Sequence, residues 1–165
     1  MDEAGPILVV DHDDGVRVLV SSLLESAGFG TAEAETGEIA LALARAVRPR
    51  LALVDVYLPG LSGYEVCHRL KTEFGAAVPV VLISRAARGK LDEVAGMLLG
   101  ADDCLTKPFL ADELLDRVRQ VLLTAEEVPD DDRRADDAGG DCNGLEEGRH
   151  QSYPSSSSRP SSIPK

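Results

Sequence analysis

The chain has 165 residues, a formal net charge of -12 and a hydrophobic fraction of 44%. This length suits one domain of ordinary size with an appendage, and the acidic balance opposes contact with nucleic-acid phosphates or anionic lipid. No apolar run approaches the roughly 20 residues of a membrane span, and the N-terminus lacks the pattern of a signal peptide. Three separated cysteines, without a C-x-x-C spacing, favour reduced thiols. We therefore expect a cytoplasmic protein with no direct nucleic-acid or membrane partner.

Short apolar runs alternate with stretches of helical periodicity up to about residue 124. The apolar runs predict five strands, at residues 7–10, 30–34, 51–56, 78–83 and 103–106. Helical spacing of apolar residues predicts a helix after each strand, at about residues 16–27, 38–47, 62–73, 90–99 and 110–123. Strands that alternate with helices pair in parallel through right-handed crossovers. The pattern therefore predicts an α/β fold, a doubly wound five-stranded parallel sheet flanked by five helices.

The composition changes after Ala125. Residues 125–165 are acidic at first, then rich in Ser and Pro, and they contain almost no large apolar side chains. Such a segment cannot bury enough apolar surface to offset the entropy lost on ordering, so we expect a disordered tail. The predicted folded domain is thus residues 1–124, and we expect no effector domain in residues 125–165.

Polar side chains that could bind a ligand or take part in a reaction lie at the ends of four predicted strands. They are Asp11, Asp55, Ser84 and Lys107. Because the carboxyl ends of parallel strands meet at one edge of a sheet, we expect these side chains to share one site. Each of these residues alone is weak evidence for a functional site. The strong evidence is that residues so far apart in the sequence are expected to meet in one place.

The carboxylates of this site need a positive partner. Asp11 and Asp55, joined by Asp13 or Asp14, cannot all stay ionised in one cleft without a counter-charge. Lys107 offers one, and a hard cation such as Mg2+ offers another because it binds carboxylate and carbonyl oxygens. A carboxylate in this setting can attack phosphorus and form an acyl phosphate, with both cations neutralising the phosphoryl oxygens.

Together these residues resemble the receiver domain of two-component response regulators, a flavodoxin-like and CheY-like fold. The resemblance covers residues 7–123. Its motifs are the acidic end of the first strand, D-x-x-x-P-x-x-x-G at Asp55, Pro59 and Gly63, a hydroxyl residue ending the fourth strand, and K-P-F at 107–109.

The resemblance implies a signalling role and no enzymatic turnover beyond the protein's own phosphorylation and dephosphorylation. Asp55 would accept a phosphoryl group from a sensor histidine kinase or phosphotransfer protein. Asp11, Asp55 and the backbone carbonyl of Tyr57 would hold Mg2+, or Mn2+. Ser84 and Lys107 would read the phosphorylated state, and the last helices with the fifth strand would contact a downstream protein. Phosphorylation-linked homodimerisation is left open.

Three positions depart from the family pattern. His12 stands where the family has its second acid, and a neutral imidazole is a poor ligand for Mg2+. Either Asp13 replaces that acid, or the metal binds weakly, or the site favours a transition metal. Cys104 occupies the place of the family's switch aromatic and cannot swing as a ring does, which leaves Ser84 as the mobile switch residue. Arg85 either pairs with the site's carboxylates or points into solvent.

Two other classes of function compete with this interpretation. A pseudo-receiver would use the same fold as a phosphate-independent protein-binding module, an idea that His12 and Cys104 favour. A haloacid-dehalogenase-like phosphatase would use Asp11 as nucleophile and Asp13 as acid/base, but it gives Asp55 no role and its threonine is missing. A flavodoxin-like cofactor binder would need a phosphate-cradling loop after the first strand, which the sequence does not supply.

Overall fold

The computed structural model describes residues 4–86 and 89–127. Within these residues five strands alternate with five helices, as the sequence pattern predicts. In chain order the elements are β1 (Ile7–Val10), α1 (Asp14–Ser26), β2 (Thr31–Ala34), α2 (Gly37–Val47), β3 (Leu51–Asp55), α3 (Gly63–Phe74), a short 3-10 helix η1 (Gly75–Ala77), β4 (Val80–Arg85), α4 (Gly89–Leu98), β5 (Asp103–Lys107) and α5 (Ala111–Glu126).

The five strands form one parallel sheet in the order β2-β1-β3-β4-β5. The chain runs from β1 outward to β2 and then returns to β3 on the other side of β1, so the strand order reverses between β1 and β3. In this register Val10 pairs with Val54, so the residue after β1 lies beside the last residue of β3. Ligand sites of doubly wound sheets form at such a reversal, at the carboxyl ends of the strands.

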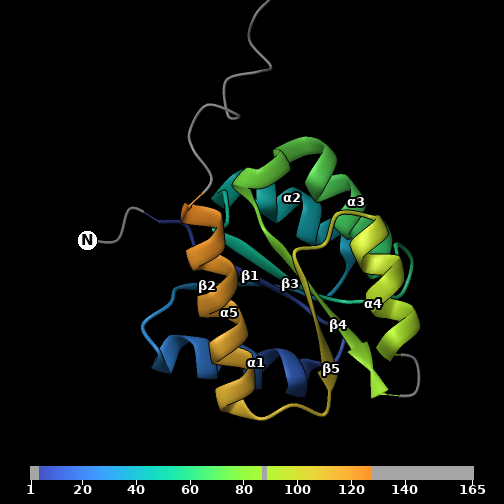
Figure 1. Ribbon diagram of the computed structural model, residues 1–165. Coiled ribbons are helices and arrows are strands. Elements are labelled where there is room, and N and C mark those ends of the chain that lie inside the picture. The colour runs from blue at the N-terminus through green and yellow to red at the C-terminus, as the bar shows by residue number, and fades with distance from the viewer. Residues whose placement is uncertain (1–3, 87–88, 128–165) are drawn as a thin grey trace, which may run out of the picture.

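Helices cover both faces of the sheet (Figure 1). Helices α1 and α5 pack on one face and α2, α3 and α4 on the other. Successive strand residues point to opposite faces, so Ile7 and Val9 of β1 join the core under α1 and α5, while Leu8 and Val10 join the other core. Burial on both faces explains why the central strands are continuous apolar runs.

Most element boundaries differ from the sequence prediction by one to three residues. Strand β4 runs from Val80 to Arg85, two residues later at both ends than the predicted range 78–83. Helix α1 begins at Asp14, because the Asp13 side chain accepts a hydrogen bond from the Val16 N–H and caps the helix there. Helix α5 continues to Glu126, past the predicted domain boundary at residue 124. Most of the predicted tail, residues 128–165, lies outside the described residues.

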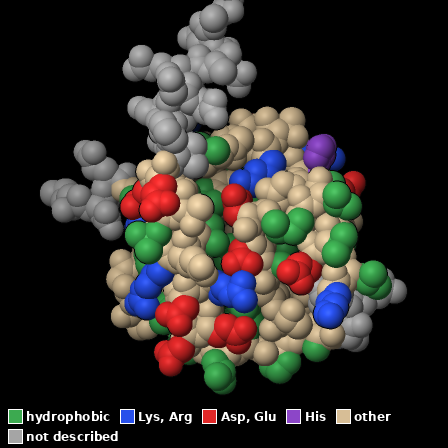
Figure 2. Space-filling view, in the orientation of Figure 1, with side chains coloured by type: hydrophobic (Ala, Val, Ile, Leu, Met, Phe, Trp, Pro, Cys, Tyr) green, Lys and Arg blue, Asp and Glu red, His purple; other side chains and the backbone are tan. Residues whose placement is uncertain are grey.

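The surface carries acidic and basic side chains side by side, with hydrophobic side chains exposed among them (Figure 2). Several of the large exposed hydrophobic residues belong to one helix, α4. Among the described residues, no helix combines the length and apolarity that crossing a membrane requires.

Candidate functional site

Two buried carboxylates and one ammonium group meet at the carboxyl edge of the sheet. Asp11 directly follows β1 and Asp55 ends β3, and their exposures are 3% and 2%. Lys107, at the end of β5, donates hydrogen bonds from Nζ to Asp11 Oδ2 at 2.8 Å and to Asp55 Oδ2 at 2.9 Å. The two aspartates lie 96 and 52 positions from Lys107 in the sequence. The fold thus brings together three of the four residues that the strand-end pattern predicts to share one site.

The Lys107 ammonium is the positive partner that these carboxylates require. Burial alone would lower the pKa of Lys107, but the hydrogen bonds and charges of Asp11 and Asp55 outweigh burial, and its pKa is raised above the ordinary value. Lys107 therefore stays charged at neutral pH. Its side chain is 25% exposed, so one side of this cation faces the solvent.

Backbone groups fix the second oxygen of each carboxylate. The Asp13 N–H donates to Asp11 Oδ1 at 2.9 Å, and the Tyr57 N–H donates to Asp55 Oδ1 at 2.8 Å. Each carboxylate is thus held between one loop amide and the Lys107 ammonium. A single cationic side chain joins two loops that are far apart in sequence.

The glycine of the D-x-x-x-P-x-x-x-G motif allows the close approach of α3 to Asp55. A Cβ on Gly63 would lie 2.1 Å from the Asp55 backbone oxygen and 2.6 Å from the Val56 Cα. The Gly63 N–H also donates to the Val56 carbonyl at 2.9 Å. Only glycine fits here without moving the backbone that carries Asp55, which gives the spacing of the motif a physical reason.

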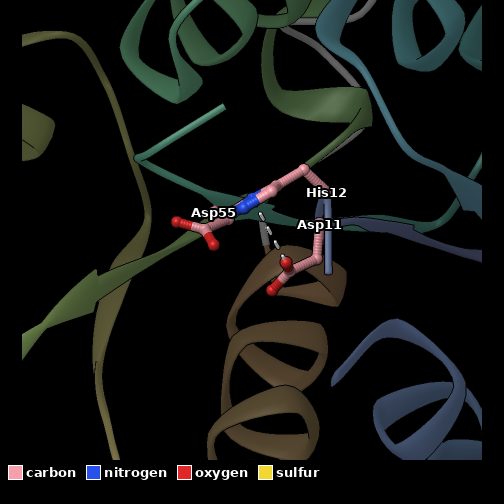
Figure 3. Close-up of side chains that lie close together, drawn as sticks. All are labelled: Asp11, His12 and Asp55. Atoms are coloured by element: carbon pink, nitrogen blue, oxygen red, sulfur yellow. Dashed lines mark ion pairs between the residues drawn. The ribbon is translucent and has the colours of Figure 1, made fainter. Parts of the chain in front are cut away.

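His12 lies over the same pair of carboxylates (Figure 3). Its Nδ1 is 3.8 Å from Asp11 Oδ1, and its side chain is 46% exposed. Among the described residues, Asp11, His12 and Asp55 each offer one ligand atom within 4.8 Å of the others. The sequence left open whether Asp13 replaces the missing acid. The structure brings His12 and not Asp13 into this group, since Asp13 Oδ1 caps α1 at 3.1 Å from the Val16 nitrogen.

The third carboxylate of the loop turns away from the site. Asp14 is exposed and pairs with Arg17 on the surface of α1. Arg17 also donates from Nη1 to the Asp11 carbonyl at 2.8 Å and so ties α1 to the end of β1. Of the candidate acids in this stretch, Asp11 alone carries its carboxylate to Asp55.

The two candidate switch residues, Ser84 and Cys104, lie in the neighbouring strands β4 and β5. Ser84 is fully buried, and its Oγ has no hydrogen-bond partner within the described residues. Burial raises the pKa of the neighbouring Cys104 thiol, and the approach of Ser84 opposes this rise. A hydroxyl group without a fixed partner is free to take up a new acceptor. The switch roles expected of Ser84 and Cys104 stay predictions.

Arg85 is exposed, as one of the two interpretations of the sequence expects, and it also contacts an aromatic ring. Its guanidinium lies over the Tyr57 ring, 4.6 Å from the ring centroid. No ion pair between Arg85 and the site's carboxylates occurs among the described residues. The cation–π contact instead covers the loop that follows Asp55.

A second buried carboxylate, Asp92 of α4, is a feature that sequence reasoning missed. Asp92 is 4% exposed, accepts a hydrogen bond from the Tyr57 hydroxyl at 3.2 Å and accepts a second one from the Tyr64 hydroxyl. These contacts join α4 to α3 and to the loop after Asp55. The pattern within α4 gave no signal for this contact, because the phenol partners lie 35 and 28 positions away.

Proteins of known family resemble this chain in sequence. The sequence pattern of the response regulator receiver domain matches residues 7–119. The DNA-binding response regulator MtrA of Mycolicibacterium smegmatis is 41% identical over 123 residues, which cover 74% of this chain and 53% of that protein. The DNA-binding dual master transcriptional regulator RpaA of Synechocystis is 40% identical over 125 residues, which cover 74% and 51%. The chain thus spans about half the length of these curated relatives.

A solved structure supports the same assignment. The receiver domain of NtrX from Brucella abortus matches with a TM-score of 0.68 at 34% identity, over 72% of this chain and 98% of that one. The site geometry, the sequence pattern and the structural match agree. This chain belongs to the response regulator receiver domain family.

Proposed function

We propose that Asp55 accepts a phosphoryl group from a sensor histidine kinase or phosphotransfer protein, and that the phosphorylated form signals through contact with a downstream protein. The observation that carries this proposal is the joint contact of Lys107 with Asp11 and Asp55. Receivers of this family interact with histidine kinases or phosphotransfer proteins, and the cytoplasmic location expected from the sequence belongs to the same proposal. The expected absence of an effector domain stays a prediction.

The chemistry follows from the Asp55 carboxylate. One of its oxygens attacks phosphorus, the bond between phosphorus and the donor's imidazole nitrogen breaks, and its electron pair stays on that nitrogen. Lys107, which already donates to Asp55 Oδ2, is within reach of a new phosphoryl oxygen. Its charge offsets the negative charge that develops on the equatorial oxygens. The Ser84 hydroxyl, without a partner among the described residues, supplies a further donor.

The residues present also suit a divalent cation. The Lys107 ammonium, within 2.9 Å of oxygens from both aspartates, demonstrates that one positive charge fits between them. Asp11, Asp55 and the Tyr57 carbonyl would hold Mg2+ or Mn2+, and the metal would supply charge neutralisation at the phosphoryl oxygens. The set has one carboxylate fewer than the family pattern, because His12 takes that position.

An apolar rim beside the site favours a protein as the phosphoryl donor. A surface pocket of about 490 Å3 is lined by α1 and by the segments that follow β4 and β5, including Lys107 itself. Its apolar lining residues are Val16, Leu19, Ala86, Pro108 and Phe109. A helical donor could place its phosphohistidine at the ammonium while burying apolar surface against this rim.

Downstream contact is best supported by α4. Its outward side exposes large apolar side chains, with Leu91 71% and Leu98 83% exposed. An apolar helix face that remains in solvent is typical of an interaction surface. Because Asp92 of the same helix is hydrogen bonded to Tyr57, two residues beyond Asp55, the site and this face are physically linked.

The test is incubation with acetyl phosphate and either Mg2+ or Mn2+, followed by intact mass measurement. We expect the mass of one phosphate on the wild type and on Asp14→Asn, a control at an exposed acid of the same loop. Asp55→Ala should gain none. No gain with either metal, or a gain that survives Asp55→Ala, would overturn the proposal.

A pseudo-receiver is the second candidate, and one observation favours it. His12, and not a second acid, completes the group with Asp11 and Asp55, which leaves the cation site one carboxylate short of the family pattern. A partner that binds equally to the wild type and to Asp55→Ala, with no phosphate gained from acetyl phosphate, would establish this function instead.

A further inference from the structure

We propose that the cation site prefers transition-metal dications that accept imidazole, such as Co2+ and Zn2+, over Mg2+, because His12 is a metal ligand. The inference rests on the proposed function in placing the cation beside Asp55, and it goes further by giving His12 a role. Residue 12, where the sequence departs from the receiver family pattern, would thus determine which metal binds.

The spacing of the three side chains suits one small cation. Ligand atoms from Asp11, His12 and Asp55 lie within 4.8 Å of one another. Two ligands on a tetrahedral zinc-sized ion lie about 3.4 Å apart, since each bond is about 2.1 Å long. The widest of these pairs must therefore close by up to about 1.4 Å to bring the three atoms into one coordination sphere.

His12 can supply that shift. Its side chain is 46% exposed, and its one polar contact among the described residues is the 3.8 Å approach of Nδ1 to Asp11 Oδ1. This distance is too long for a hydrogen bond, so ring rotation breaks none. The loop beneath the ring is fixed, because the Asp13 N–H donates to Asp11 Oδ1 and the Asp13 side chain caps α1. The backbone holds the imidazole over the site while the ring stays free to turn.

Lys107 and a metal can occupy the carboxylates together. Lys107 donates hydrogen bonds to Oδ2 of Asp11 and to Oδ2 of Asp55. Asp11 Oδ1 faces His12, and within the described part of the chain it accepts one hydrogen bond, from the Asp13 N–H, while Asp55 Oδ1 accepts one, from the Tyr57 N–H. A carboxylate oxygen has two lone pairs, so each Oδ1 keeps one for a metal. The metal would thus bind on the His12 side and leave the ammonium in place.

The nature of the donors sets the preference. Mg2+ sheds water reluctantly and takes oxygen ligands, whereas Co2+ and Zn2+ bind imidazole nitrogen well and follow the rising affinity order of the first-row metals. Two carboxylates with one imidazole therefore form a mixed nitrogen and oxygen set. An aspartate in place of His12 would restore an all-oxygen set and raise the affinity for Mg2+.

The test compares metal affinities of the full chain, free of a His tag, as the wild type, His12→Asp and His12→Ala. Calorimetry gives the dissociation constants of Zn2+ and Mg2+, and the visible absorption of Co2+ reports its ligands directly. We expect the ratio of Zn2+ to Mg2+ affinity to fall at least about tenfold in His12→Asp, the size of effect typical for groups that tune a metal site. His12→Ala should weaken Co2+ binding without improving Mg2+ binding.

Two controls separate this site from other metal ligands. His68→Ala, at an exposed histidine of α3, should leave every affinity unchanged. In an Asp11→Asn background, His12→Ala should have no further effect on Co2+ binding, because the two residues act on one ion. An unchanged ratio in His12→Asp, or a Co2+ spectrum that His12→Ala leaves unaltered, would overturn the inference.

Failure of this inference differs from failure of the proposed function. Phosphate gain on Asp55 from acetyl phosphate, measured by mass in the same samples, reports the function alone. If Asp55 gains phosphate but the ratio of Zn2+ to Mg2+ affinity is the same in the wild type and His12→Asp, the proposed function stands and the inference about the metal is wrong. If the ratio depends on His12 but Asp55 never gains phosphate, the inference about the metal stands and the receiver function falls.

Discussion

Asp55 and Asp92 are both buried carboxylates beside the loop after β3, at 2% and 4% exposure, yet their partners differ in kind. Asp55 is held by the charged ammonium of Lys107 at the open edge of the sheet, and Asp92 by the neutral hydroxyls of Tyr57 and Tyr64 between two helices. Both arrangements offset the cost of burying a carboxylate, one by charge and the other by hydrogen bonds.

The difference indicates which centre can change its ligands. The Lys107 ammonium is partly exposed and sits on a flexible stem, so a metal or a phosphoryl group can share or replace its contacts. The two phenols are fixed in α3 and in the loop after Asp55, and their removal would leave Asp92 without a donor among the described residues. The first centre is suited to chemistry, and the second to holding α4 in register with the site.

The largest effect on stability is expected at the charged centre. Lys107→Met removes the ammonium that pairs with both buried carboxylates and should lower the free energy of unfolding by about 3 kcal/mol, the lower end for a broken buried pair because Lys107 is partly exposed. Urea unfolding measures this loss, and added Mn2+ should restore part of it. Arg119→Met, at an exposed site of α5, is the control.

The same variant has a defined pH dependence. Because the folded pKa of Lys107 is raised, its contribution is fully present below the unfolded value of about 10.4 and is lost as pH rises through the folded pKa. The stability difference between the wild type and Lys107→Met should therefore be constant across neutral pH and shrink only at alkaline pH. A difference that shrinks between pH values of about 7 and 9 would contradict the charge pairing.

The sequence predicts the charged centre at Asp55 but not the neutral centre at Asp92. The charged centre could be found, because continuous apolar runs identify the strands of a parallel sheet and topology brings their ends together. Asp11 and Asp55 each follow such a run, and Lys107 follows the short predicted strand at 103–106, so no side-chain contact had to be known in advance. The Gly63 spacing was read as a motif, and only the structure gives its reason, the close approach to the Asp55 carbonyl.

The neutral centre could not be predicted because local patterning in α4 points the other way. Apolar residues at helical spacing, Leu91, Val94 and Leu98, suggest an inward face, yet all three are exposed, at 71%, 61% and 83%. Asp92 faces inward because two phenols from other elements meet it there. That contact depends on residues distant in sequence, which periodicity within one helix cannot reveal.

A smaller effect is expected from removing the acceptor of the neutral centre. Asp92→Leu removes the acceptor of two hydroxyl hydrogen bonds and should destabilise the fold by about 2 kcal/mol, while Asp92→Asn, which keeps one acceptor oxygen, should cost less. Urea unfolding of both variants measures the difference. If Asp92→Asn is as damaging as Asp92→Leu, the charge of Asp92, and not its hydrogen bonds, is what matters, and the contrast with Asp55 would disappear.

Asp92→Leu also tests the link between α4 and the phosphorylation site. Phosphate gain on Asp55 should persist in this variant, since Asp92 makes no contact with Asp55 among the described residues. Phosphorylation of Asp55 should alter the hydrogen exchange of the α4 amides less in this variant than in the wild type. The measurement compares the exchange of these amides with and without acetyl phosphate. An unaltered exchange response would leave Asp92 with a purely structural role.

The smallest effect concerns one phenol and distinguishes the two centres by pH. Burial raises the pKa of Tyr64 above its ordinary value of about 10, and the hydrogen bond to Asp92 adds to the rise. Tyr64→Phe should cost about 1 kcal/mol at neutral pH, the typical worth of one hydrogen bond.

Because the folded pKa of Tyr64 is raised, its contribution is present below pH of about 10 and is lost as pH rises through the folded pKa. Alkaline difference spectra between the wild type and Tyr64→Phe should therefore show one tyrosinate that forms late, together with unfolding. A Tyr64 that titrates at its ordinary pKa while the chain stays folded would mean that its hydroxyl is solvated and not bound to Asp92. In that case the hydrogen bonds of the tyrosine hydroxyls would not explain how the Asp92 carboxylate of α4 is buried without a cation.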